Sequence, residues 1–340
     1  MSVAMRRVPA VASGSAFAVA AVIAGLASVT VFLFAWFSTG HLPGDAVTYA
    51  AAGERLNAGH EIYRLLPGDS PVLMEPPYPP VPLLSPPLIA VVFRPLALLP
   101  GLAGAWLWFA TMAILLGLAI AVLLRAAPVV TGILLTVLSF PVAVLVGVGN
   151  VDALVISGSV GAWLLLRDRR DTAAGALIGT LASLKLTPLI LAWWLLAQDR
   201  RRALVAFAAT IGALAVVTVA GSSVDVFGDY LGVIGAAAGV APGGYSLAGV
   251  ARGAGVPVEI AVLLPRLAIG IGLVLVVLLR SRPAPAWAAA GLLLWLGSPA
   301  AATHTPALAL VALAPLADRL PAGNPFRPRP ASDQTGDDAQ

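Results

Sequence analysis

Eight apolar runs constrain the fold of this chain more than any other feature. They cover Ser15–Phe37, Leu102–Leu124, Val129–Val148, Val151–Leu166, Ala203–Gly221, Ile260–Leu279, Pro285–Leu296 and Pro306–Leu316. A helix needs about 20 consecutive apolar residues to cross a bilayer, and most of these runs approach or exceed that length. They predict an all-α polytopic membrane protein with about eight transmembrane helices, of which the last two are the shortest.

The composition excludes a water-soluble enzyme. Hydrophobic residues make up 59% of the chain and charged residues only 11%, whereas soluble domains carry about 25% charged residues. Such an excess of apolar side chains cannot be hidden beneath a solvated surface. The net charge of +4 therefore indicates membrane topology signals, and we expect no nucleic-acid partner. The absence of cysteine excludes disulfides, thiolate catalysis and Cys-ligated metals.

Basic residues cluster at the ends of the apolar runs and predict the orientation of the chain. The clusters contain Arg6, Arg7, Arg125, Arg167, Arg169, Arg170, Arg200, Arg201, Arg202, Arg280, Arg282, Arg319, Arg327 and Arg329. Because such residues accumulate on the cytoplasmic side, both termini are expected there. We expect residues 1–320 to form one transmembrane domain and residues 321–340 a disordered polar tail. The remaining polar residues then gather on the extracytoplasmic face.

Two further apolar segments are not predicted to be single straight transmembrane helices. Ala173–Ala197 is interrupted by Lys185 and Pro188, and it is flanked by basic residues that should share one side. We interpret it as a re-entrant hairpin, with a single crossing as the alternative. Val81–Pro100 is interrupted by Pro82, Pro86, Pro87, Pro95 and Arg94, so we expect broken helices lying in the outer interface.

The densest polar patch follows the first apolar run. Asp45 precedes a helical pattern and could act as the N-cap of that helix. An acid at the membrane–water boundary could instead be a general base that takes a proton from a sugar hydroxyl. The other candidates for substrate or phosphate binding in this patch are Tyr49, Glu54, Tyr63 and Arg64.

Five further residues are candidates for binding, each with a structural alternative. Tyr78 lies in a proline-rich segment that could be only a rigid spacer. Asn150 either caps the next helix or binds a polar substrate together with Asp152. Lys185, the single lysine, is costly at membrane depth and needs an anionic partner, unless it snorkels to the interface. His304 is either structural or part of the site.

The order of these features resembles glycosyltransferase family 87, the polyprenol-phosphate-mannose-dependent α-1,2-mannosyltransferases of actinobacteria. The resemblance spans about residues 40–310. It rests on an ordered set of short motifs: Asp45 with Tyr49, Leu56–Gly59 with Ile62 and Tyr63, Tyr78–Pro80, Gly149 with Asn150, Lys185 with Pro188, and Ser298–Pro299 followed by His304.

The resemblance implies a GT-C fold and an inverting sugar transfer on the outer face of the membrane. The donor would be a mannosyl phosphoryl polyprenol, with other hexoses or pentoses as variants. The acceptor would be a mannoside glycolipid, lipoglycan or polysaccharide of the cell envelope. Asp45 takes the place of the family's catalytic base, and His304 that of the histidine at the donor phosphate.

Physical reasoning adds requirements of its own. An amphipathic donor needs a lipid-facing groove for its tail and a cation for its phosphate. Lys185, His304 and Arg64 are the candidates for phosphate binding, while Tyr49, Glu54, Tyr63, Tyr78, Asn150 and Asp152 are the candidates for substrate binding. We expect no cofactor and no obligatory metal, because a positioned cation can stabilise the leaving phosphate. The alternatives are a lipid or solute transporter, a flippase, or an inactive GT-C scaffold.

Overall fold

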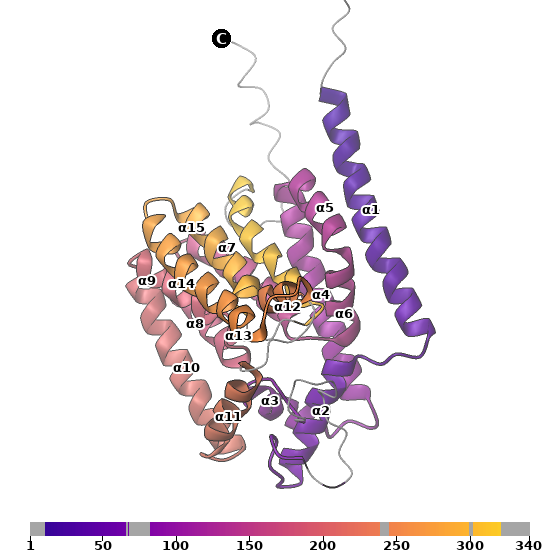
Figure 1. Ribbon diagram of the computed structural model, residues 1–340, viewed down its shortest axis with the longest axis vertical. Helices are drawn as coiled ribbons and strands as arrows, with labels where there is room; N and C mark the ends of the chain where they lie inside the picture. Colours follow the sequence, from indigo (N-terminus) through magenta and orange to yellow (C-terminus); the bar gives the residue numbers. More distant parts are fainter. Residues whose placement is uncertain (1–10, 66, 68–81, 239–244, 299–301, 321–340) are drawn as a thin grey trace, which may run out of the picture.

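The computed structural model describes residues 11–65, 67, 82–238, 245–298 and 302–320, and this part of the chain contains helices and no strand (Figure 1). The prediction of an all-α fold is confirmed for these residues. The elements are α1 (Val11–Ser38), α2 (Gly44–Asn57), α3 (Leu88–Leu96), α4 (Ala103–Ala126), α5 (Pro128–Val137), α6 (Ser139–Val148), α7 (Asp152–Arg167), α8 (Asp171–Leu184), α9 (Leu189–Ala197), α10 (Arg201–Gly221), α11 (Val226–Ala238), α12 (Leu247–Gly253), α13 (Val258–Ala261), α14 (Leu263–Leu278), α15 (Pro283–Leu296) and the 3₁₀-helix η1 (Thr305–Arg319). Tyr78 and residues 321–340 lie outside the described residues.

Four helical segments are long and apolar enough to cross a membrane: Ala16–Ser38, Ala103–Ala126, Arg201–Gly221 and Val258–Leu278. The bent pair of α5 and α6 would make a fifth span. The chain is therefore a polytopic membrane protein. The count of about eight spans stays a prediction, because α7, α8 and α15 have only 16, 14 and 14 residues.

The run Val129–Val148 is not one straight helix, because α5 and α6 meet at an angle of 73°. Pro141 explains the break. A proline has no N–H to donate, and its ring clashes with the carbonyl group four residues earlier, which here belongs to Val137, the last residue of α5. The sequence carried this signal, since Pro141 lies inside the apolar run.

The segment Ala173–Ala197 folds into α8 and α9, separated by a break in which Lys185 adopts an extended backbone. Arg200, just after α9, pairs with Asp171 in the first turn of α8 at 3.0 Å. The two ends of the segment therefore lie at the same end of the bundle, as the hairpin interpretation requires. Entry of this hairpin into a membrane stays a prediction. The neighbouring stretch Val81–Pro100 contains only α3, whose nine residues are too short for a span.

Small residues allow close helix packing in the bundle. Gly175 and Gly179 of α8 lie against Ala203 and Phe207 of α10, where an added Cβ would collide with backbone oxygen atoms. Membrane helices pack through such positions because lipid removes the hydrophobic drive between them. A second centre of packing is a cluster of three indoles, Trp163, Trp194 and Trp287, whose ring centroids lie 5.0–5.8 Å apart.

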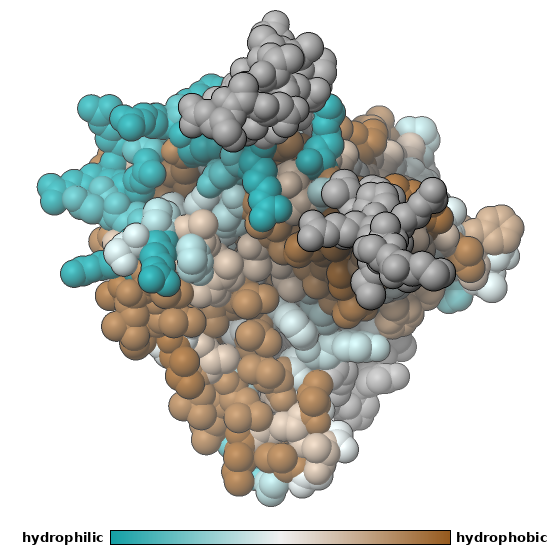
Figure 2. Space-filling model, turned by 90° about the horizontal axis from the view of Figure 1, so that it is seen from above, coloured by the Kyte–Doolittle hydropathy of each residue, from teal (hydrophilic) through white to brown (hydrophobic). Residues whose placement is uncertain are grey.

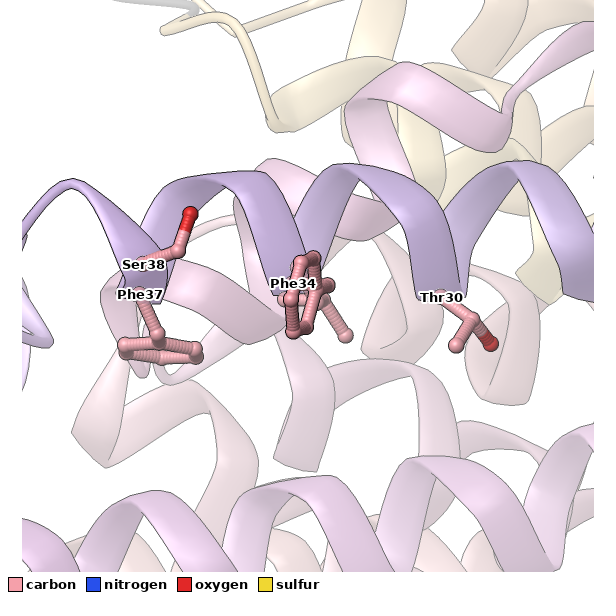
Figure 3. Close-up of a pocket in the computed structure, with 5 residues that line it drawn as sticks. Thr30, Phe34, Phe37 and Ser38 are labelled. Atoms are coloured by element: carbon pink, nitrogen blue, oxygen red, sulfur yellow. The ribbon is translucent and has the colours of Figure 1, made fainter.

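Helix α1 lies along the outside of the bundle against α5 and α6 (Figure 1). Its surface carries a hollow of about 420 Å³, where Figure 3 labels Thr30, Phe34, Phe37 and Ser38. Both hydroxyl groups in this hollow donate to backbone carbonyls of α1 itself. The hollow is therefore an apolar surface suited to lipid chains. The residues that the sequence predicts for substrate and phosphate binding do not line it.

The two ends of the bundle differ in chemistry. Arg167, Arg169, Arg200 and Arg202 lie at what we call the basic end, where α7 and η1 finish and α8, α10 and α15 begin. Figure 2 views the molecule from above Figure 1 and shows hydrophilic residues gathered on one side of that face. At the opposite end, called the α2 end, α2 and α3 meet the last turn of α10, and Arg94 donates to the carbonyl of Gly221 at 3.0 Å.

Candidate active site

Asp45 lies at the start of α2 but does not cap it. The N-cap residue of α2 is Pro43, and no side chain forms a cap hydrogen bond there. The half-buried Asp45 carboxylate instead accepts a hydrogen bond from Asn150 at 2.6 Å between Oδ2 and Nδ2. The interpretation of Asp45 as an N-cap was therefore wrong. No other hydrogen bond joins Asp45 to a described residue, so Oδ1 stays available.

Gly149 makes the approach of Asn150 to Asp45 possible. It ends α6 in the left-handed backbone region with φ of 69°, which glycine adopts without the penalty of a Cβ atom. A Cβ added here would lie 3.0 Å from Cβ of Ala46, the neighbour of Asp45. The carbonyl of Gly149 is held by Trp108 Nε1 at 3.0 Å. Together these contacts fix the turn between α6 and α7 against α2.

Asn150 connects Asp45 to a second, fully buried acid. Its Oδ1 accepts a hydrogen bond from the backbone N–H of Asp152 at 2.8 Å, while its Nδ2 donates to Asp45. Asn150 is only 8% exposed and Asp152 is fully buried. Asn150 therefore precedes the N-cap residue of α7, Val151, and its side chain accepts from the first N–H of that helix. Binding of a polar substrate by Asn150 stays a prediction.

Two basic side chains from segments distant in sequence lie beside Asp152. Lys185 Nζ lies 2.6 Å from Oδ1, and His304 Nε2 lies 3.6 Å from Oδ2. Neither carboxylate oxygen has a hydrogen-bond partner of good geometry among the described residues, so the compensation is ionic. A buried charge is costly without such a partner. The anionic partner that Lys185 requires is thus a carboxylate of the protein, and the lysine does not snorkel alone.

His304 lies in the turn between α15 and η1 and is buried. Burial lowers its pKa from 6.5, with Lys185 acting in the same direction and the two aspartates, Asp152 and Asp45, opposing the shift. The imidazole of the unliganded protein is therefore neutral at pH 7. It can accept a proton when an additional negative charge enters the site.

Two buried tyrosines were candidates for substrate binding, and only Tyr49 lies near Asp45. Tyr49, one helical turn after Asp45, is buried, and its pKa is raised well above 10.0 by burial and by Asp45. Tyr63 donates to the carbonyl of Ser85 at 2.7 Å and packs against Tyr230 at 5.7 Å between ring centroids. Both phenols stay protonated, so they can only donate or accept hydrogen bonds and carry no charge.

Two predicted residues lie away from this cluster. Glu54 follows Asp45 by nine positions, which places it on the opposite face of α2 at about 100° per residue, and it is exposed. Arg64 is also exposed and pairs with Glu61 at 3.8 Å. The structure thus brings Asp45, Asn150, Asp152, Lys185 and His304 together and leaves Glu54 and Arg64 outside.

An apolar groove of about 280 Å³ lies next to Lys185. Ser183 and Leu186, on either side of the lysine in sequence, line it together with Leu214 of α10 and Phe227 and Tyr230 of α11. Almost all of its surface is hydrocarbon. The groove therefore offers an apolar channel that reaches the residues around the single lysine.

The sequence model of glycosyltransferase family 87 matches residues 84–299. The chain belongs to this family. Comparison with curated proteins and with solved structures found no match in either set. The family assignment makes the protein a glycosyltransferase, which uses a sugar donor and an acceptor, and it decides against the transporter and flippase alternatives.

The matched region of the family 87 chain covers only part of the cluster. Asn150, Asp152 and Lys185 lie within residues 84–299, whereas Asp45 precedes the matched region and His304 follows it. Their association with the matched residues rests on the geometry described above. Among the described residues, no three His, Asp or Glu side chains form a group suited to hold a metal ion.

Three residues that support the candidate site could not be identified from the sequence. Trp108, Ser85 and Tyr230 support Gly149 and Tyr63 from other elements. Trp108 lies within a long apolar helix, where the sequence gives no indication that a tryptophan supports a polar site. Ser85 accepts from Tyr63 through its backbone carbonyl, a role that no residue type reveals.

Proposed function

We propose that this family 87 enzyme transfers a mannosyl unit from a polyprenyl-phosphate sugar to a mannoside glycolipid or lipoglycan of the cell envelope. The supporting observation is the cluster in which Asp45 lies one hydrogen bond from Asn150 and the Lys185–Asp152 pair lies beside an apolar groove. A water-side base, a cation and a hydrocarbon channel are the three parts that an amphipathic donor requires.

Asp45 acts as the general base in this proposal. The carboxylate takes the proton of an acceptor hydroxyl, and the resulting oxygen forms a bond with C1 of the donor sugar. The bond between C1 and the phosphate oxygen breaks, with inversion at C1, and polyprenyl phosphate leaves with the bonding electrons. The proton then passes from Asp45 to water. Asn150 holds Oδ2 of Asp45 and leaves Oδ1 to face the acceptor.

Lys185 and His304 bind the donor phosphate. Lys185 forms an ion pair with Asp152. The two charges of this pair cancel, and the neutral His304 adds none. A phosphate would draw Lys185 toward itself and favour protonation of His304. Lys185 and the protonated His304 then supply two positive charges that stabilise the leaving phosphate, and no metal is needed for this step. The polyprenyl tail occupies the groove lined by α8, α10 and α11.

The sugar and acceptor lie at the α2 end, which we place on the extracytoplasmic face with both termini in the cytoplasm. The arginines at the opposite end of the bundle support this orientation. Tyr49 and Tyr63 line the side of the sugar site, and Asp152 fixes Lys185. Hexosyl or pentosyl donors other than mannose fit the same arrangement.

The test is an assay of the purified protein in lipid nanodiscs with polyprenyl-phosphate-[¹⁴C]mannose and an envelope lipid extract. We expect a radioactive glycolipid whose formation is lost in Asp45→Asn and retained in Glu54→Gln, an exposed acid on the opposite face of the same helix. A wild-type protein that forms no product from any polyprenyl-phosphate sugar, yet uses a nucleotide sugar, would overturn the proposal.

A further inference from the structure

A second polar hollow lies at the basic end of the bundle, away from the candidate active site. Its volume is about 590 Å³. Its charged lining consists of Arg167, Arg169, Arg200, Arg202, Asp171 and Asp318. Asp152 begins α7 at the active site and Arg167 ends the same helix at this hollow. At 1.5 Å per residue the two sites are roughly 22 Å apart.

The positive charge of this hollow exceeds what its acids neutralise. Asp171 pairs with Arg200 at 3.0 Å, and Asp318 accepts a hydrogen bond from Trp163 Nε1 at 2.8 Å. Arg169 and Arg202 are exposed at its rim and form no ion pair with a described residue. Two guanidinium groups therefore remain available to a ligand.

Arg167 lines the hollow with a guanidinium that is held in place. Its Nε bonds Asp168 at 2.9 Å and its Nη1 donates to the carbonyl of Ala317 at 3.0 Å, which fixes the plane of the guanidinium. Its Nη2 is buried and has no hydrogen-bond partner among the described residues. A buried donor without an acceptor is unfavourable, so an acceptor oxygen that reached this atom would be stabilising.

The neighbourhood of the arginines is that of a membrane interface. Trp163, Trp194 and Pro283 form the apolar part of the lining, and α8, α10 and α15 begin here. Helix N-termini carry partial positive charge, and basic pockets between membrane helices suit lipid head groups. A soluble anion would use the arginines alone, whereas a lipid would also use the adjacent helix surfaces.

We propose that this hollow binds the phosphate group of an anionic lipid at the basic end of the bundle. The guanidinium groups of Arg169 and Arg202 meet the phosphate from the rim, and Arg167 lines the wall of the hollow behind them. This site is separate from the donor site and does not depend on the proposed reaction.

The experiment measures dioleoyl phosphatidylglycerol binding to delipidated full-length protein by native mass spectrometry, with dioleoyl phosphatidylcholine and inorganic phosphate as the other probes. The variant is Arg169→Gln with Arg202→Gln. The control is Arg280→Gln with Arg282→Gln, which removes the same charge from exposed residues that do not line the hollow. Each Arg near a membrane surface contributes on the order of 1 kcal/mol, so the variant should bind the anionic lipid roughly tenfold more weakly or worse.

Selective binding of phosphatidylglycerol, weakened in the variant and kept in the control, supports the proposal. Inorganic phosphate that binds as tightly as the lipid, with the same dependence on Arg169 and Arg202, would retain the phosphate site but assign it to a soluble ligand. Equal lipid binding by the wild type and the variant would overturn the proposal. Equal weakening in the variant and the control would also overturn it, since a diffuse surface charge would explain the result.

Discussion

Lys185 Nζ lies 2.6 Å from Asp152 Oδ1 and joins the break between α8 and α9 to the first residue of α7. The lysine side chain is 23% exposed, whereas the aspartate is completely buried. The loss of one partner should therefore affect stability differently from the loss of the other. Removal of the lysine strands a buried charge, while removal of the aspartate leaves a lysine that can still reach water.

This asymmetry predicts that Lys185→Ala destabilises the protein much more than Asp152→Asn. Breaking a buried pair from the cation side typically costs about 3–5 kcal/mol. The double variant Lys185→Met with Asp152→Asn should recover most of that loss, because no charge is left buried. Thermal unfolding in detergent, followed by tryptophan fluorescence, measures all three variants.

The exposed pair Arg201–Asp199 serves as the control for this prediction. Its side chains are 83% and 76% exposed, so solvent screens the interaction and Arg201→Ala should leave the unfolding temperature unchanged. Equal unfolding temperatures for Lys185→Ala and Arg201→Ala would show that Lys185 and Asp152 are not a buried, mutually dependent pair.

Asp45→Asn should abolish turnover while preserving the fold. General base catalysis typically contributes about 10²–10⁴-fold to rate, and the amide cannot take a proton from the acceptor. An asparagine oxygen at this position can still accept the hydrogen bond from Asn150, so the local structure is retained. Steady-state kinetics with a fixed donor should show a fall in kcat, with Glu54→Gln as the matched control. An Asp45→Asn enzyme with the wild-type kcat would remove Asp45 from the mechanism.

The positions of the four long apolar helices could be predicted from sequence, because apolar runs of about 20 residues have few alternatives in a membrane protein. The requirement of Lys185 for an anionic partner was also predictable from burial cost alone. The identity of that partner was not, since Asp152 and Lys185 belong to separate elements and only the tertiary fold sets their separation. Arg64 shows the same limit. Its predicted role required the side chain to reach the donor phosphate, whereas the structure exposes it to solvent beside Glu61.

Local rules were decisive in one case and misleading in another. Pro141 predicts the break between α5 and α6, although the apolar run around it suggests a continuous helix. Asp45 fits the composition rule for an N-cap, yet α2 begins at Gly44 after Pro43, which places the carboxylate inside the first turn. A two-residue shift of a helix boundary thus separates an N-cap aspartate from one that reaches Asn150.

The burial of His304 predicts the sign of two pH effects. Its folded-state pKa is lowered from the unfolded value of 6.5, so below that value the unfolded chain binds more protons. Stability contributed by the neutral imidazole is therefore complete above pH 6.5 and is lost as the pH falls toward the folded-state pKa. Asp152 and Asp45 oppose this shift, while Lys185 adds to it.

A bound phosphate reverses the preference, because an anion near His304 favours the imidazolium. Donor affinity should therefore increase as the pH falls below neutrality, although the unliganded protein becomes less stable. Donor KD measured from pH 5.5 to 8 in wild type and His304→Gln tests this, the range being roughly centred on the ordinary histidine pKa. The variant should lose the pH dependence. An identical slope in both proteins would exclude His304 from the phosphate site.

Orientation in the membrane can be tested at two serines, because the chain has no native cysteine. Ser223 is exposed near the α2 end, and Ser281 is exposed in the turn between α14 and α15 at the basic end. In intact cells, an impermeant maleimide should label Ser223→Cys and not Ser281→Cys, because basic residues favour the cytoplasmic side. The opposite labelling pattern would place the candidate active site in the cytoplasm.

Gly149 and Gly59 form a matched pair that separates backbone strain from crowding. Both adopt positive φ, 69° and 74°, and an alanine in this region costs about 1–2 kcal/mol. A Cβ at Gly59 would meet nothing within 4 Å, whereas one at Gly149 would lie 3.0 Å from Ala46 Cβ and push the turn away from α2. Both alanine variants should lower the unfolding temperature, and Gly149→Ala should lower it more because crowding adds to the backbone strain. Only Gly149→Ala should also reduce kcat, on the order of 10- to 100-fold, because a small displacement of Asn150 alters the position of Asp45. If Gly149→Ala were no less active than Gly59→Ala, the hydrogen bond between Asn150 and Asp45 would not be what positions the base.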